Sequence, residues 1–156
     1  MKIDHIAIWT DDIETMRDFY LTYFDVTCGN KYVNPIKNFT SYFLSFGDGN
    51  ARIELMTKPG IEETNGKRGF TKGLAHLSIT IGSKKDVDSL TERLRTDGYT
   101  IAGEPRTSGD GYYESAVLDP EGNYIELLEN NGLYRQHHND FYVLEPESNQ
   151  TIKYFT

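Results

Sequence analysis

The feature that most constrains this fold is an internal repeat with a period of about 70 residues. The segment DHIAI near the N-terminus is matched later by AHLSI, and RIELM is matched by YIELL. His5 and His76 lie 71 positions apart, and Glu54 and Glu126 lie 72 positions apart. Such a period is too long for a solenoid unit and corresponds to a whole structural module. The chain is therefore predicted to contain two copies of one module.

Each copy shows the order strand, helix and then three β-rich runs. Asp11 or Asp12 can cap the first helix, and Ser83 can cap the second, which Gly98 ends. The expected strands are 2–9, 26–33, 39–46 and 51–57 in the first copy and 73–81, 99–106, 112–118 and 123–130 in the second. Two βαβββ modules of this kind give eight strands, enough for two curved sheets that face each other.

The expected organisation is a single α+β domain over residues 1–156. Module 1 spans about 1–57, a polar and glycine-rich linker spans 58–73, and module 2 spans about 74–130. The aromatic tail at 131–156 is outside the repeat and is expected to pack on the domain. It contains His137 and His138, which we interpret as surface residues because neighbouring side chains point apart.

Composition excludes several classes of function. The net charge of −8, with no basic run, disfavours binding to nucleic acid or to an anionic membrane surface. No apolar stretch is long enough for a membrane span, and the N-terminus lacks a signal-peptide pattern, so a cytoplasmic protein is expected. Cys28, the single cysteine, has no partner for an internal disulfide, and nothing in its turn-like surroundings supports a catalytic thiol.

Strand alternation places one ionisable residue on the less apolar face of each of four strands. These residues are His5, Glu54, His76 and Glu126. Each one alone is best explained as an ordinary core histidine or a solvated glutamate, but the matched spacing in both copies favours a shared site. One divalent cation would offset the cost of burying two close carboxylates. Two imidazoles and two carboxylates suit Ni²⁺, Zn²⁺, Co²⁺, Mn²⁺ or Fe²⁺, with open positions for water or substrate.

Residues 3–130 resemble the vicinal oxygen chelate superfamily, the glyoxalase/bleomycin resistance protein family that includes glyoxalase I. The resemblance is carried by DHIAI, ARIEL, GLAHLSI and DPEGNYIEL. It implies paired βαβββ modules that form a cupped, eight-stranded mixed sheet around one metal ion. It also implies that His5, Glu54, His76 and Glu126 are the ligands, that Glu126 is the principal base and that Glu54 serves the opposite face of the substrate. A homodimer follows from the resemblance as well, with each metal bound within one chain or across two.

Glu54 favours a metal-dependent lyase or isomerase of the glyoxalase I type, similar to lactoylglutathione lyase. Methylmalonyl-CoA epimerases resemble this pattern with Gln at that position, and fosfomycin-resistance enzymes and ring-cleaving dioxygenases use three ligands. Proteins of this fold that only sequester a small molecule typically lack the metal set. The alternatives to a glyoxalase I-like enzyme are an epimerase or a thiol-transfer or hydrolytic resistance enzyme on the same scaffold, or a non-catalytic protein that sequesters a small molecule.

One position departs from the glyoxalase pattern. Trp9 occupies the slot where many glyoxalases have a glutathione-binding Arg, so the thiol stays open. Trp9 can stack on a substrate ring or, as we favour, fill the core, and Arg52 can replace the missing Arg or pair with a carboxylate.

Overall fold

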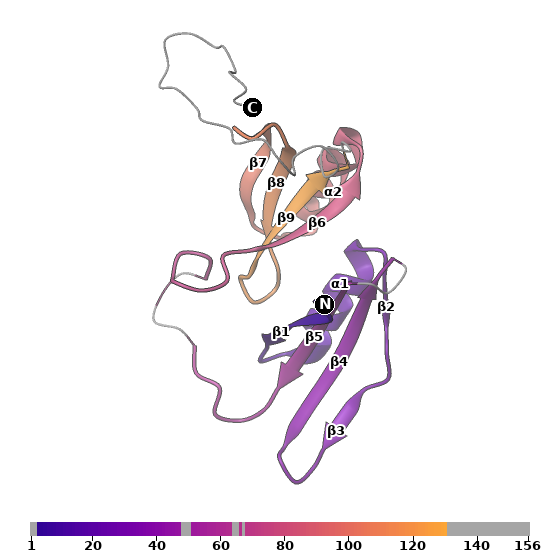
Figure 1. Ribbon diagram of the computed structural model, residues 1–156, viewed down its shortest axis with the longest axis vertical. Helices are drawn as coiled ribbons and strands as arrows, with labels where there is room; N and C mark the ends of the chain where they lie inside the picture. Colours follow the sequence, from indigo (N-terminus) through magenta and orange to yellow (C-terminus); the bar gives the residue numbers. More distant parts are fainter. Residues whose placement is uncertain (1–2, 48–50, 64–65, 67, 131–156) are drawn as a thin grey trace, which may run out of the picture.

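The computed structural model describes residues 3–47, 51–63, 66 and 68–130, and these form two βαβββ modules (Figure 1). The first module contains β1 (His5–Trp9), α1 (Ile13–Tyr23), β2 (Val26–Cys28), β3 (Tyr32–Asn34), β4 (Phe39–Phe46) and β5 (Ala51–Thr57). The second contains β6 (Leu77–Gly82), α2 (Lys84–Thr96), β7 (Ile101–Thr107), β8 (Tyr113–Leu118) and β9 (Tyr124–Glu129). The predicted α+β repeat is confirmed.

The described strands form two separate mixed sheets. The first sheet has the order β1-β5-β4-β2, with β3 also paired to β4, and the second has the order β6-β9-β8-β7. In each module the first strand runs parallel to the last one, and the last one is antiparallel to its other neighbour. The first strand of each module therefore lies beside the last strand, which brings the candidate His and Glu of each copy onto neighbouring strands.

The first sheet has one strand more than the sequence predicts, because the expected strand 26–33 is divided. Cys28 pairs with Leu44, whereas Tyr32 pairs with Ser41. Four residue steps from β2 to β3 therefore face only three residue steps along β4, and this offset interrupts the strand pairing between β2 and β3.

Each helix covers one face of its own sheet, and the core lies between them. Met16 and Tyr20 of α1 are fully buried, as is Leu55 of β5. Leu94 of α2 and Leu127 of β9 are equally buried in the second module. The aliphatic strand faces expected from alternation thus pack under the helices. The opposite face of each sheet, which its helix does not cover, is called the open face below.

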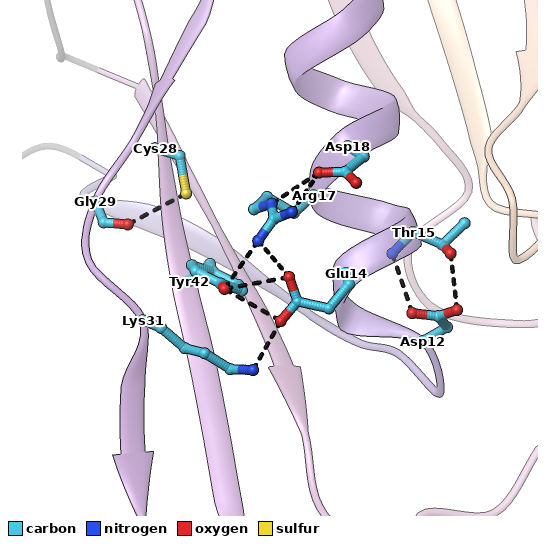
Figure 2. A network of polar contacts seen from close by, with 9 residues as sticks. All are labelled: Asp12, Glu14, Thr15, Arg17, Asp18, Cys28, Gly29, Lys31 and Tyr42. Atoms are coloured by element: carbon cyan, nitrogen blue, oxygen red, sulfur yellow. Dashed lines mark hydrogen bonds and ion pairs between the residues drawn. The ribbon is translucent and has the colours of Figure 1, made fainter.

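Polar contacts also attach α1 to the first sheet (Figure 2). The Arg17 guanidinium donates to the hydroxyl of the buried Tyr42 over 3.0 Å, and that hydroxyl lies 3.1 Å from Glu14. Lys31 donates to Glu14 over 2.7 Å, and this hydrogen bond lowers the pKa of Glu14. The network fixes the position of α1 against β4.

The two modules meet through α1. Its Phe19 ring lies 4.9 Å from the ring of Tyr99, which follows α2. The N-terminal end of α1 contacts the turn between β8 and β9, where the Glu121 carboxylate accepts from the backbone N–H of Asp11 over 2.7 Å and of Asp12 over 3.0 Å. The DPEGN turn thus joins the modules as well as reversing the chain. Among the described residues, no helix has the length and apolarity that a membrane span requires.

Candidate metal centre

The first candidate ligand pair joins β1 and β5 on the open face of the first sheet. The parallel register sets Ala7 opposite Glu54, which brings Nε2 of His5 within 3.6 Å of Oε2 of Glu54. The other ring nitrogen of His5 lies 2.9 Å from Asp4. A carboxylate at that nitrogen orients the ring and leaves Nε2 to face Glu54.

The second pair repeats this arrangement in the second module. His76 comes directly before β6, and its Nε2 lies 3.7 Å from Oε2 of Glu126 on β9. The two modules therefore hold equivalent imidazole–carboxylate pairs with almost the same separation.

Glu114 is a further acidic residue beside the second pair, and the sequence reasoning missed it. It is buried on β8, and Arg106 of β7 forms an ion pair with it over 2.7 Å. Burial raises the pKa of Glu114, and the negative charge of Glu126 raises it further. Strand alternation places Glu114 on the same face as Ala116, which pairs with Glu126. Only the register between β8 and β9 shows that Glu114 lies beside Glu126.

The donor chemistry of each pair fits a divalent metal. Imidazole nitrogen and carboxylate oxygen bind such ions at about 2.0–2.2 Å, which sets two tetrahedral ligands roughly 3.4 Å apart. The separations of 3.6 and 3.7 Å are close to that value. Within the described part of one chain, however, no three His, Cys, Asp or Glu side chains gather as a metal site. The four predicted ligands thus form two half-sites on two separate sheets.

The two predicted substrate residues both lie on the open face of the first sheet. Trp9 is 36% exposed, so its interpretation as a core residue is wrong. Its ring meets the edge of Phe39 at 6.2 Å. Arg52 forms an ion pair with Asp4 and lies over the ring of Phe43, 4.5 Å from its centroid. Of the two roles considered for Arg52, the structure shows the pairing with a neighbouring carboxylate.

A cavity of about 360 Å³ opens where the two modules and the connecting segment meet. Trp9 and His76 both contribute to its wall, together with Arg68 and Tyr124. Arg68 donates to the side-chain oxygen of Asn123 over 3.0 Å, which ties the connecting segment to the DPEGN turn. The volume is in the range of small-molecule sites, so this cavity gives a ligand access to His76.

Two other sequence features have less bearing on the site. Burial raises the pKa of the Cys28 thiol, and its sulfur lies 3.2 Å from the carbonyl oxygen of Gly29 (Figure 2). A raised pKa lowers the fraction of reactive thiolate, which agrees with a structural cysteine. His137 and His138 lie in the tail, outside the described residues.

Comparison with known proteins identifies a family. Residues 2–127 match the sequence model of the Glyoxalase/Bleomycin resistance protein/Dioxygenase superfamily. The chain is 28% identical over 133 residues to a lactoylglutathione lyase of Haemophilus influenzae, an alignment that covers 83% of this chain and 93% of the relative.

Solved structures show the same fold. Glyoxalase I of Zea mays superimposes with a TM-score of 0.68 and 25% identity over 81% of this chain, which corresponds to 44% of the maize chain. A superfamily domain from Frankia sp. superimposes with a TM-score of 0.69 and 19% identity, covering 89% of this chain and 98% of the other. The trypanothione-dependent glyoxalase I of Leishmania major gives 0.65 and 24% over 87% and 91% of the two chains.

Proposed function

Because the chain belongs to the glyoxalase/bleomycin resistance protein/dioxygenase superfamily, we propose that it is a metal-dependent lyase of the glyoxalase I type. The observation that carries this proposal is the pair of equivalent His–Glu half-sites, with separations of 3.6 and 3.7 Å. A protein that only sequesters a ligand has no need of this duplicated donor set. The substrates expected from the lactoylglutathione lyase relative are adducts of a thiol with a 2-oxoaldehyde, which offer two neighbouring oxygens.

One divalent ion, Ni²⁺, Zn²⁺, Co²⁺, Mn²⁺ or Fe²⁺, would be held by the four predicted ligands and would act as a Lewis acid on the two substrate oxygens. The ligands are His5, Glu54, His76 and Glu126. The two histidines would hold the metal ion, and the two carboxylates can also accept and donate protons. Glu126 would take the proton from the substrate carbon, and Glu54 would serve the opposite face of the substrate.

We further propose that the active form is a homodimer in which each metal is held between two chains. The support is the arrangement of the half-sites, which lie on the open faces of two separate sheets of one chain. A second copy can supply the missing half to each site through a two-fold axis, because such an interface pairs every contact with its equivalent.

Replacing Glu126 by Gln tests the catalytic proposal. The variant keeps the size of the side chain and a metal-binding oxygen but loses the proton-accepting carboxylate. Positioned general bases contribute about 10²–10⁴-fold to rate, so we expect a loss of that order in the conversion of thiol adducts of 2-oxoaldehydes. Metal content, measured by mass spectrometry on protein purified without added metal, is expected near one ion per site in the wild type.

Glu129→Gln is the matched control, because Glu129 is on the same strand but on the opposite face from Glu126. It should leave both turnover and metal content unchanged. Wild-type turnover in Glu126→Gln would contradict the assigned base. Metal-free wild-type protein that stays metal-free when supplied with these ions would contradict the metal site.

A further inference from the structure

A groove at one end of the first sheet combines aromatic rings with lysines. It measures about 550 Å³ and is lined by Trp9, Tyr32, Asn34, Lys37, Phe39 and Lys58. Tyr32 is 54% exposed and Trp9 is 36% exposed. Large aromatic side chains that stay this accessible and adjoin one another are typical of binding surfaces.

The rings form the walls and the floor of this groove. The Phe39 ring is central, with its centroid 6.2 Å from that of Trp9 and 6.1 Å from that of Tyr32. Strand pairing sets Trp9 opposite Met56, Met56 opposite Ser41 and Ser41 opposite Tyr32. Three strand spacings separate the outer residues by about 14 Å at the backbone, and the Phe39 ring of β4 contacts both of their rings. A flat ligand ring in the groove can therefore pack against the accessible surfaces of Trp9, Phe39 and Tyr32.

The two lysines give the groove a positive charge. The Lys58 ammonium lies 5.2 Å from the centroid of the Trp9 ring. Lys37 is in the turn between β3 and β4, where its backbone N–H donates to the side-chain oxygen of Asn34 over 3.1 Å. Neither lysine forms an ion pair with a carboxylate of the described residues, although the chain has a net charge of −8. Two such ammonium groups beside apolar rings attract an anion.

We propose that this groove binds an aromatic carboxylate, with the ring against Trp9, Phe39 and Tyr32 and the carboxylate between Lys37 and Lys58. The chemistry on the two sides is complementary: ring faces meet a ring, and ammonium groups meet a negative charge. The groove is on the same open face as the first half-site, and Trp9 follows His5 by four residues on β1. Four strand residues span about 13 Å.

The link to catalysis rests on the proposed function. If the reacting end of the substrate lies beside His5 and Glu54, the substrate extends along β1, and its aromatic carboxylate end occupies the groove about 13 Å away. The groove thus selects elongated substrates with an aromatic acid at the far end over small aldehyde adducts.

Trp9 is the only tryptophan of the chain, so intrinsic tryptophan fluorescence reports directly on this groove. The probe is phenylacetate, compared with phenylacetamide, which has the ring without the charge, and with acetate, which has the charge without the ring. We expect a saturable change with phenylacetate and at least about tenfold weaker binding of the other two, since both the ring and the charge contribute. Equal binding of all three, or no saturable change with phenylacetate, would overturn the proposal.

Lysine variants locate the anion contact. Lys37→Gln combined with Lys58→Gln should weaken phenylacetate binding at least about tenfold and leave the phenylacetamide affinity unchanged. Lys84→Gln combined with Lys85→Gln, which removes the same number of positive charges from the surface of α2, is the control and should bind as the wild type does. Unchanged phenylacetate affinity in the double variant would overturn the carboxylate position.

The groove and the proposed function can fail separately. Phenylacetate binding is measured with the protein as purified and with Glu126→Gln, and both should bind equally. Phenylacetate binding by protein that stays metal-free when supplied with the proposed divalent ions would support the groove and contradict the metal enzyme. Metal-dependent turnover without phenylacetate binding would support the metal enzyme and contradict the groove. A signal that disappears as protein concentration rises would show that a second copy covers the groove, which also overturns the proposal.

Discussion

Thr91 and Ser115 form a buried polar contact that ties α2 to β8. Both side chains are fully buried, and their hydroxyl oxygens lie 2.7 Å apart. The Thr91 hydroxyl donates to the backbone carbonyl of Val87 over 2.7 Å. Because a hydroxyl has one hydrogen, Ser115 must be the donor to Thr91. The two residues therefore depend on each other unequally.

Thr91→Val is predicted to destabilise the protein more than Ser115→Ala. The valine keeps the shape but leaves the Ser115 donor buried without its acceptor, at a cost of about 1–3 kcal/mol. In Ser115→Ala, Thr91 keeps its bond to Val87, and we expect about 0.5–1.5 kcal/mol. The free energy of unfolding, measured in urea, checks this order. The double variant should cost less than the sum of the two, and an additive double variant would contradict the contact.

At the scale of single elements, α2 begins at a reciprocal cap. The Ser83 side chain accepts from the backbone N–H of Asp86, and the Asp86 carboxylate accepts from the backbone N–H of Ser83 over 2.8 Å. The hydrogen bond from the Ser83 hydroxyl is the main cause that lowers the pKa of Asp86 below 3.8. A carboxyl whose pKa is lower in the folded state stabilises the fold above its unfolded pKa, and this contribution is lost as pH falls through the folded value.

Ser83→Ala is therefore predicted to lower the free energy of unfolding by about 1 kcal/mol. Asp86→Asn removes the titration, so its stability should fall less steeply than that of the wild type below about pH 4. Urea unfolding across a series of pH values measures both effects. A wild-type slope in Asp86→Asn would show that the cap carboxylate does not titrate with folding.

Sequence periodicity predicts those elements whose local signals agree with their packing. The bounds of β4 and β5 match the expected runs, and Ser83 caps α2 as predicted, because alternation and capping are local rules. The division of 26–33 depends on which residue of β4 faces each position, and that register is a long-range property. Sequence alone therefore predicts the elements better than their pairing.

The same limit applies to the candidate site. Repeat spacing identifies His5 with Glu54 and His76 with Glu126, and the structure brings each pair close together. Glu114 joins Glu126 only through the pairing of β8 with β9, and alternation alone does not show this. The exposure of Trp9 depends on which face of the sheet α1 covers, and strand alternation alone does not identify that face.

At the scale of the whole molecule, the contacts of α1 hold the modules in one relation. The Glu121 carboxylate accepts hydrogen bonds from the backbone N–H groups of Asp11 and Asp12, just before α1. The buried hydroxyl of Tyr20, on α1, has Asp119 of the same turn as its charged neighbour. Burial, and next the charge of Asp119, raise the pKa of Tyr20 well above its usual value. The sheet faces that the helices cover are therefore buried by contacts within the chain. The open faces with the half-sites are left for contacts with a ligand or a second copy.

Mixing two inactive variants tests whether each metal spans two chains. One variant carries His5→Ala with Glu54→Gln and lacks the first half-site, and the other carries His76→Ala with Glu126→Gln and lacks the second. In a mixed dimer with shared sites, one centre has all four ligands and the other has none. Since random pairing gives half mixed dimers, we expect about one quarter of the wild-type metal content and turnover.

Each variant alone should bind no metal at the site and show no turnover. Co-expression with two different affinity tags isolates the mixed dimer, in which about half of the wild-type values are expected. If each metal is bound within one chain, neither chain of the mixed dimer has a complete set, so no activity returns. An inactive and metal-free mixed dimer would therefore reject the shared site. Restoration cannot arise from unassociated chains, because each of them lacks one half-site completely.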